Sequence, residues 1–298
     1  MEGRESRKRS SWATWWIAWV RLLRLQTSAI FPAMGIAAAS LVSRPPVHPW
    51  QAFLPAALIF TGSASAYMLN DAFDVEVDKV SNPARPLPSG VLPARQVVVI
   101  ASLVLCGSVL ITLLLGSFTS LLLALVLCCL AFAYSVPPLR LRRFFVAPYL
   151  TIAASASLSF LLAASYWSGD LDSALVMGSI LIFGYSSGSC MVKEFKDMEG
   201  DSRMGVRSLP VVLGVHAAVR VTIPIYLASC LLVVPFFWLF GLSPAFFLFF
   251  GTVFLAKCST SYDLVKDPFD MRRRMRILGV EVASTILLFL GIAASAIV

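Results

Sequence analysis

Long apolar runs alternate with short charged segments along the whole chain. About 20 apolar residues suffice for one helical membrane span, and two of the runs are long enough for two spans each. Gly116–Ser117 and residues 241–244 supply the turns that would divide these two long runs. The pattern predicts nine transmembrane helices, the first beginning near Trp15, over residues 25–43, 51–70, 96–139 (two), 144–169, 173–192, 221–256 (two) and 277–298.

The composition excludes the two commonest alternatives to a membrane protein. Of the 298 residues, 58% are hydrophobic and only 13% are charged, whereas soluble domains carry about 25% charged residues. Disordered chains are richer still in charge and poorer in apolar residues. We therefore expect an all-α, multi-pass membrane protein in which residues 1–298 form a single integral-membrane domain, preceded by a basic tail over residues 1–14.

The basic residues are distributed unequally between the two predicted faces. Of the 24 Lys and Arg residues, all but Arg44 fall on one face if nine spans are present. Such an excess marks the cytoplasmic side. The N-terminus and the charged loops are therefore predicted to be cytoplasmic and the C-terminus to lie on the opposite side. The basic start followed by an apolar run could be a signal peptide, but we interpret it as a retained first helix.

Acidic residues cluster directly after the second span. Asn70, Asp74 and Asp78 have i, i+4, i+8 spacing, and Asp71 is three residues before Asp74, so on a helix they share one face. Like charges near an apolar core are costly, and a divalent cation relieves the repulsion. Oxygen ligands favour Mg²⁺ or Ca²⁺ over soft metals.

A second acidic cluster follows the sixth span and matches the first. It contains Lys193, Glu194, Asp197 and Asp201. Surface acids at solvated helix ends are the ordinary explanation of one such cluster, but two matched clusters make that explanation the weaker one. We infer two related four-helix halves plus a ninth helix, a kind of repeat common in membrane folds, with both clusters facing a shared cavity.

Carboxylates that face basic residues suggest a diphosphate clamp. Mg²⁺ can bridge carboxylates and phosphates, and cations stabilise the charge on a departing diphosphate. No phosphate-binding Gly-x-x-x-x-Gly-Lys loop is present, which disfavours nucleotide hydrolysis. No His or Cys grouping has the spacing of a metal or catalytic site. An oily cavity suggests a lipid chain on the diphosphate, and candidate cations are Arg85, Arg140, Arg142, Arg143 and Lys193.

These motifs resemble those of the UbiA-type intramembrane prenyltransferases. The first extends from Asn70 to Asp78 and continues to Gly90, the second is the Tyr-Ser-Val-Pro-Pro-Leu-Arg segment from Tyr134 to Arg142, and the third extends from Lys193 to Asp201 and continues through Gly205 to Pro210. Three long motifs in this order make the resemblance specific, although the family often has Lys-Asp where this chain has Lys193-Glu194.

The resemblance implies a helical bundle whose central cavity opens sideways to lipid, and Mg²⁺-dependent transfer of an isoprenyl group from its diphosphate. Asp74, Asp197 and Lys193 would be catalytic, and Tyr134 joins them because aromatic faces stabilise cations. Tyr67, Phe73 and Tyr185 also lie near the motif ends, where packing is the commoner role. Asn70, Asp71, Asp74, Asp78, Glu194, Asp197 and Asp201 would hold metal, and Arg85, Arg140, Arg142 and Lys193 the diphosphate.

The acceptor is the least determined part of the prediction. The motif strings look most like the branch that prenylates geranylgeranylglyceryl phosphate. Prenylation of an aromatic or quinone precursor and terpene cyclisation, in which the substrate's own alkenes trap the cation, are the alternatives within the family. A secondary transporter is the alternative outside it, but transporters place their acids near the membrane midplane. Beyond the prenyl diphosphate, the acceptor and membrane lipid, neither nucleic acid nor a protein partner is implied.

Overall fold

The computed structural model describes residues 12–42 and 49–297, and within these ranges the chain is helical without strands. The prediction of an all-α protein is therefore confirmed. The helices are α1 (Trp12–Leu22), α2 (Leu25–Ser28), α3 (Ile30–Val42), α4 (Pro49–Phe73), α5 (Val75–Ser81), α6 (Ala94–Leu115), α7 (Phe118–Ser135), α8 (Ala147–Ser168), α9 (Ser173–Lys193), α10 (Met198–Arg203), α11 (Leu209–Leu213), α12 (Val215–Leu231), α13 (Phe236–Phe240), α14 (Phe246–Lys266) and α15 (Met271–Ile297), with short 3₁₀ turns η1 (Leu141–Arg143) and η2 (Glu194–Lys196).

The predicted turns and breaks coincide with helix ends. Gly116 and Ser117 separate α6 from α7, and the Ser117 side chain accepts a hydrogen bond from the backbone N–H of Ser120, which caps α7. The predicted break at residues 241–244 lies between α13 and α14. Most of the predicted basic tail, residues 1–11, lies outside the described residues, whereas residues 12–14 belong to α1 rather than to a tail.

The first predicted span is bent. Arg24 has a left-handed backbone (φ 46°), which ends α1 and redirects the chain into α2. The axis turns by 41° between residues 12–28 and residues 30–42. Because a left-handed non-glycine residue is costly, a break at Arg24 needs support from tertiary contacts.

Six described helical segments are long and apolar enough to cross a membrane, or seven if the bent pair counts as one span. The helices α4 and α14 are not among them, so the prediction of nine spans is confirmed only as far as a multi-pass helical architecture. Both helices are interrupted by polar side chains. These include Thr61, Ser63 and Ser65 in α4, and Lys257, Thr260 and Asp263 in α14.

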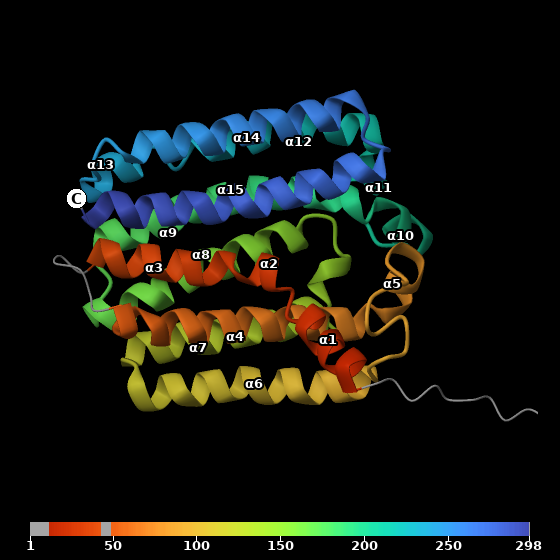
Figure 1. Ribbon diagram of the computed structural model, residues 1–298, viewed down its shortest axis with the longest axis horizontal. Coiled ribbons are helices and arrows are strands. Elements are labelled where there is room, and N and C mark those ends of the chain that lie inside the picture. Colours follow the sequence, from red (N-terminus) through yellow and green to blue (C-terminus); the bar gives the residue numbers. More distant parts are fainter. Residues whose placement is uncertain (1–11, 43–48, 298) are drawn as a thin grey trace, which may run out of the picture.

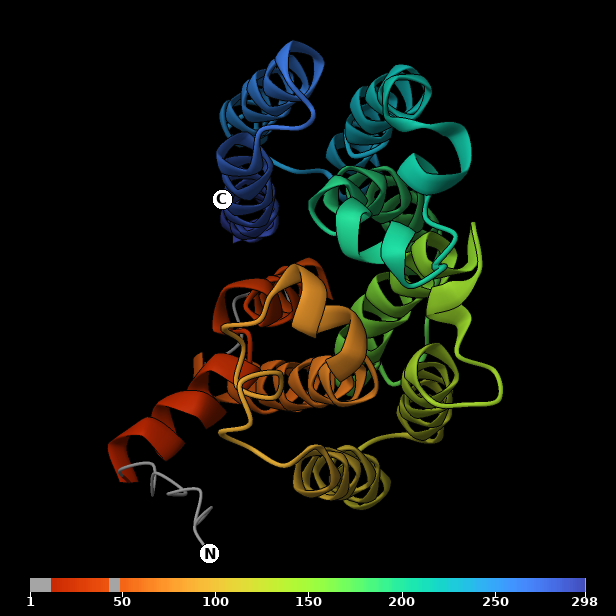
Figure 2. The same cartoon turned by 90° about the vertical axis from the view of Figure 1, so that its right-hand side faces the viewer.

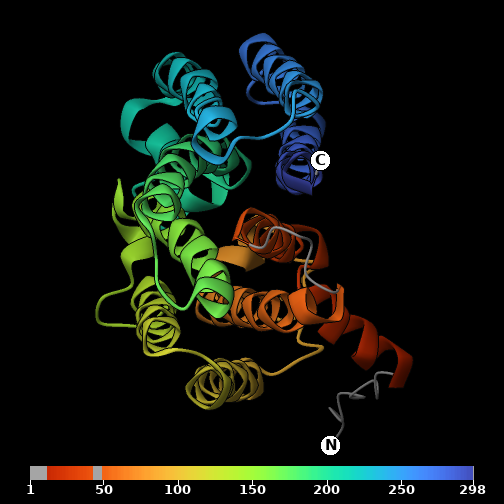
Figure 3. The ribbon, with the colours of Figure 1, turned by 90° about the vertical axis from the view of Figure 1, so that its left-hand side faces the viewer.

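The long helices form a ring in chain order. Neighbours along the chain, from α3 through α4, α6, α7, α8, α9, α12 and α14 to α15, pack against one another, and α15 returns to α3. Figures 2 and 3 show the ring from its two ends. Small buried residues such as Ala37 and Ala163 let helices approach closely at its centre.

The two acidic motifs lie at the same end of this ring. Figure 1 shows α5, α10 and α11 gathered at one end of the long helices, while α13 and the last turn of α15 lie at the other. The short helices α5 and α10 contact each other. Segments separated by more than 100 residues are thereby brought together.

Candidate active site

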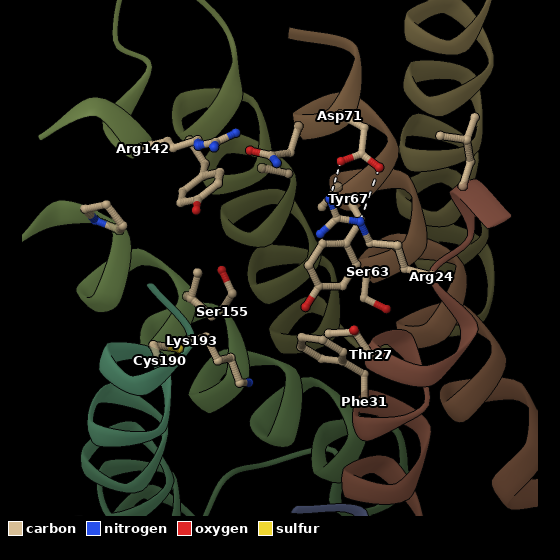
Figure 4. A pocket seen from close by; sticks show the side chains of 18 of the residues that line it. Arg24, Thr27, Phe31, Ser63, Tyr67, Asp71, Arg142, Ser155, Cys190 and Lys193 are labelled. Atoms are coloured by element: carbon tan, nitrogen blue, oxygen red, sulfur yellow. Dashed lines mark hydrogen bonds and ion pairs between the residues drawn. The ribbon is translucent and has the colours of Figure 1, made fainter. Parts of the chain in front are cut away.

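A cavity of about 940 Å³ lies between the helices and reaches the end of the ring that carries the acidic motifs (Figure 4). Its volume is in the range typical of ligand pockets. Charged side chains of both motifs line one part. The remainder is lined largely by apolar residues of α3, α6, α7 and α8, among them Phe31, Leu105, Val109, Leu127 and Leu162.

The structure brings the predicted site residues together. Asp74 and Asp78 lie behind the lining of this cavity and contact it through Arg142 and Arg85, and Arg140, also outside the lining, contacts Asp74. Within the described part of the chain, the other nine line the cavity itself: Asn70, Asp71, Arg85, Tyr134, Arg142, Lys193, Glu194, Asp197 and Asp201.

The acidic residues do not lie on two continuous helices, as the spacing predicted. The first helix stops at Phe73, and Asp74 precedes α5 with φ −107° and ψ 14°. Asp197 precedes α10 with nearly the same backbone, φ −100° and ψ 3°. After each break the i+4 backbone bonds resume from the carbonyl of the Asp itself, at 2.9 Å from Asp78 N to Asp74 O and from Asp201 N to Asp197 O. The match between the motifs therefore extends from sequence to backbone conformation.

Arginines neutralise the carboxylates of the first motif. Arg85 Nη1 donates to Asp78 Oδ2 at 2.6 Å and lies 3.4 Å from Asp71 Oδ1. Arg24 also pairs with both oxygens of Asp71, and its guanidinium lies over the Tyr67 ring. These pairs supply the tertiary support for the left-handed backbone of Arg24. Burial raises the pKa of Asp78 despite the opposing effect of Arg85.

Two further arginines, from the segment between α7 and α8, reach the same motif. Arg140 donates to Asp74 Oδ1 at 3.1 Å and to the Phe73 carbonyl at 2.6 Å. Arg142 contacts the other oxygen of Asp74, and its Nη2 lies 4.0 Å from Asp201 Oδ1. Burial lowers the pKa of Arg142. Arg142 thus lies between one carboxylate of each motif.

The two carboxylates of the second motif have opposite electrostatic environments. Burial alone would raise the pKa of Asp197, but the cations Lys196, Arg85 and Arg142 lower it below its ordinary value. Lys196 Nζ lies 3.8 Å from Asp197 Oδ1. Burial raises the pKa of Asp201 to about 6 despite the nearby Arg142. Asp197 is therefore ionised at neutral pH, whereas Asp201, with its pKa of about 6, titrates just below neutral pH.

The carboxylate and amide oxygens of the two motifs are suitable ligands for a hard divalent cation, although the carboxylates point at arginines rather than at one another. No three His, Cys, Asp or Glu side chains of residues 12–42 and 49–297 are grouped closely enough to hold an ion. Yet Asn70 Oδ1 and Asp201 Oδ1 are buried without a hydrogen-bond partner in that part of the chain. Buried acceptor oxygens are normally satisfied, and oxygen is the ligand atom that Mg²⁺ prefers.

The Glu194 carboxylate is hydrogen-bonded to two other segments of the protein. Its Oε2 accepts hydrogen bonds from the Tyr149 hydroxyl at 2.6 Å and from the Leu209 backbone N–H at 3.0 Å. The side chain therefore ties α9 to α8 and to the start of α11. A metal ion bound by Glu194, as predicted, would share the carboxylate with these two hydrogen bonds.

Lys193 and two tyrosines face the cavity interior. Figure 4 shows the Lys193 side chain directed into the cavity from one wall, with Tyr67 on the opposite wall. Among the residues that the structure describes, Lys193 has no ion-pair partner. Tyr134 also lines the cavity, whereas Tyr185 is buried elsewhere and its hydroxyl lies 3.0 Å from Thr285 Oγ1. Phe73 packs into a separate cluster.

Sequence reasoning missed several polar residues of the site. Arg24, Asn82, Tyr149 and Lys196 line the cavity, and each contacts a carboxylate of one motif. Asn82 and Lys196 lie within or beside the motifs, so position could have indicated them. Arg24 and Tyr149 come from other helices, and their proximity depends on the tertiary fold.

Comparison with known proteins agrees with this arrangement. Residues 29–280 match the model of the UbiA prenyltransferase family. A digeranylgeranylglyceryl phosphate synthase from Sulfolobus acidocaldarius is 32% identical over 202 residues, which cover 66% of this chain and 70% of the relative. The bacteriochlorophyll synthase 33 kDa chain from Cereibacter sphaeroides is 31% identical over 176 residues, 58% of this chain and 57% of the relative.

A solved structure shares the fold. A UbiA homologue from Archaeoglobus fulgidus bound to DMAPP and Mg²⁺ superposes with a TM-score of 0.69 at 16% identity, covering 94% of this chain and 98% of that one. The prediction of a prenyltransferase drawn from the motifs is confirmed by the family match. The chain belongs to the UbiA prenyltransferase family and is a membrane-embedded prenyltransferase.

Proposed function

We propose that the protein transfers an isoprenyl group from a polyprenyl diphosphate to a lipid-soluble acceptor, in a Mg²⁺-dependent reaction at the cavity. The observation that carries the proposal is the juxtaposition of two carboxylate motifs and their arginines with a deep, largely apolar cavity. The charged end suits a diphosphate and the apolar part suits an isoprenyl chain. The A. fulgidus homologue named above was solved with an isoprenyl diphosphate and Mg²⁺.

Each motif would supply one metal site. Asn70, Asp74 and Asp78, with Asp71 beside them, would hold one Mg²⁺, and Asp197 and Asp201 the other, with Glu194 as an additional ligand. When bound, the metal neutralises phosphate charge and stabilises the leaving diphosphate. Because the arginines already neutralise these carboxylates, they would turn towards the phosphate oxygens as metal takes their place.

The remaining residues would bind and orient the substrate. Arg85, Arg140, Arg142 and Lys193 stabilise the negative charge that develops on the leaving diphosphate. Tyr134 and Tyr67 line the cavity, and their ring faces would stabilise an allylic cation formed there. The apolar lining excludes water, so that the acceptor rather than water traps the cation.

We propose nine membrane spans for the chain as one domain, with the motif end cytoplasmic and the cavity open sideways to lipid. Helices α4 and α14 have 25 and 21 residues, which corresponds to about 37 and 31 Å. Both lengths suffice for the hydrocarbon core of about 30 Å. Counting them with the bent pair and the six apolar segments gives nine.

For the acceptor we propose an isoprenyl glycerol phosphate such as geranylgeranylglyceryl phosphate. Several relatives, including the one from Sulfolobus acidocaldarius described above, carry the name digeranylgeranylglyceryl phosphate synthase. The bacteriochlorophyll synthase relative supports a second candidate, a tetrapyrrole acceptor. Two further alternatives remain to be tested: an aromatic or quinone precursor as the acceptor, and cyclisation of the donor without any acceptor.

Purified protein incubated with Mg²⁺ and geranylgeranyl diphosphate tests the proposal, first alone and then with each acceptor. We expect diphosphate release that depends on geranylgeranylglyceryl phosphate and yields a diether lipid phosphate. Release with a tetrapyrrole or aromatic acceptor instead would replace the proposed acceptor. Cyclised hydrocarbon without acceptor would establish a cyclase, and no release under any condition would contradict prenyl transfer.

A further inference from the structure

A buried ion pair lies inside the second half of the helix ring, outside the lining of the candidate active site. Lys257 of α14 and Glu281 of α15 are both fully buried, and Lys257 Nζ lies 3.1 Å from each carboxylate oxygen. Charge counting placed Lys257 in a loop at the predicted cytoplasmic face, whereas in the structure it is buried within α14, which continues to Lys266. Charged groups inside a membrane domain are costly and usually serve a function.

The pair is embedded in a connected polar network. Lys257 Nζ also donates to Ser189 Oγ at 2.9 Å, and it lies 3.9 Å from the centre of the Tyr226 ring and 4.6 Å from that of Tyr185. Glu281 accepts a hydrogen bond from the Tyr226 hydroxyl. The network therefore joins α9, α12, α14 and α15 through satisfied polar groups.

The network is attached to the part of α9 that carries Lys193. Ser189 precedes Lys193 by four residues, so the two lie on the same face of the helix, one turn apart. Gly188 lets α12 approach α9 closely, since a Cβ there would collide with Ser229. Glu281 lies 3.1 Å from Lys257 Nζ, which contacts Ser189, so its carboxylate is within electrostatic range of Lys193 one turn further along α9.

We propose that Lys257 is a positioning residue for Lys193, which it serves by neutralising Glu281. With Glu281 paired, the Lys193 ammonium is free to face the diphosphate. Without Lys257, Glu281 becomes an uncompensated buried anion that attracts Lys193 and repels the diphosphate. This inference rests on the proposed function, because it assigns Lys193 to diphosphate binding.

The proposal predicts effects of opposite sign for the two partners. Loss of Lys257 should weaken binding of an anion in the cavity, whereas loss of Glu281 leaves an extra cation and should not. A pair that serves only to hold helices together would give effects of the same sign, because either single loss leaves an unpaired buried charge.

Binding of Mg²⁺-pyrophosphate to the full-length protein in detergent, measured by calorimetry, tests this without requiring turnover. Lys257→Met should raise the Kd about tenfold, as expected for the loss of one charge-assisted contact, and Lys193→Met should do the same. Glu281→Gln should leave the Kd unchanged or lower it. The double variant Lys257→Met/Glu281→Gln should return the Kd to within about threefold of wild type. Lys266→Met, at an exposed lysine of the same helix, should leave the Kd unchanged.

Equal weakening by the two single substitutions, or an unchanged Kd in Lys257→Met, would overturn the inference. If Lys257→Met does not fold, Glu281→Gln and the double variant decide, and a tenfold higher Kd in either contradicts the proposal. Failure of the wild type to bind Mg²⁺-pyrophosphate would overturn the proposed function, and this inference with it. If the wild type binds Mg²⁺-pyrophosphate but both single substitutions raise the Kd, the inference is overturned while the proposed function is not.

Discussion

The Nδ2 atom of Asn82 lies 3.5 Å from Oδ1 of Asp197, although the two residues are 115 positions apart in the chain. Asn82 lies four residues after Asp78 of the first acidic motif, and Asp197 belongs to the second. Together with Arg142, which lies between Asp74 and Asp201, this contact places the two motifs at one site. A single diphosphate bound there would be within reach of both.

Replacement of Arg142 should impair this shared site. We expect Arg142→Gln to lower kcat/KM for the prenyl diphosphate by about 10²–10³, comparable to the loss of one well-placed electrostatic stabiliser. Arg95 is an exposed basic residue at the start of α6, and Arg95→Gln should leave kcat/KM within about twofold of wild type as the matched control. A steady-state assay of diphosphate release measures both, and wild-type kinetics in Arg142→Gln would exclude a role at the reacting phosphate.

Metal dependence should follow the ionisation of Asp201. Activity should disappear in excess chelator and return with Mg²⁺. Because burial raises the pKa of Asp201 to about 6, the carboxyl is protonated below that pH, and a neutral acid is a poor ligand. The Mg²⁺ concentration for half-maximal activity should therefore rise about tenfold between pH 7 and pH 5.

Asp201→Asn separates this effect from other titrations. The variant should need more Mg²⁺ at every pH, and its requirement should change little across the same range. A requirement in the wild type that is independent of pH, or full turnover in chelator, would contradict the assignment of Asp201 as a metal ligand.

The nine-span topology places the two ends of the ring on opposite sides of the membrane. A reporter inserted near Ser89, at the α5 end, should be cytoplasmic, and one fused after Val298 should be extracytoplasmic, since α15 ends at the other end of the ring (Figure 1). Accessibility labelling of the two fusions in intact cells checks this. Finding both reporters on the same side would require an even number of spans between them and would contradict the nine-span topology.

Much of the helical architecture could be predicted because it depends on local composition. The apolar run predicted over 173–192 agrees with α9 at Ser173–Lys193, and the predicted turn at Gly116–Ser117 lies between two helices. The acidic motifs, the basic residues near them and the family resemblance together identified nine residues of the cavity lining. The i+4 spacing could not predict the backbone breaks at Asp74 and Asp197, because this spacing is typical of a continuous helix.

Residues whose role depends on tertiary contacts were beyond the reach of the sequence pattern. Arg24 pairs with Asp71 across 47 positions, and its left-handed backbone separates α1 from α2. Lys257 was assigned to the cytoplasmic face because charge counting assumes that charges lie outside spans. Its partner Glu281 lies on another helix, and no local signal connects them.

The central claim is that Asp74 and Asp197 act on one diphosphate at a shared site, and a double-mutant cycle tests it most directly. Single-turnover rates should be compared for Asp74→Asn, Asp197→Asn and the double variant in folded protein. Asp170→Asn, at an exposed acid beyond the far end of α8, serves as the control and should retain the wild-type rate.

Each single substitution should lower the rate by about 10²–10³. Because residues that act as a unit lose their effects non-additively, the double variant should be little slower than the slower single variant. Costs that multiply in the double variant, or near-wild-type turnover in either single variant, would contradict a shared site.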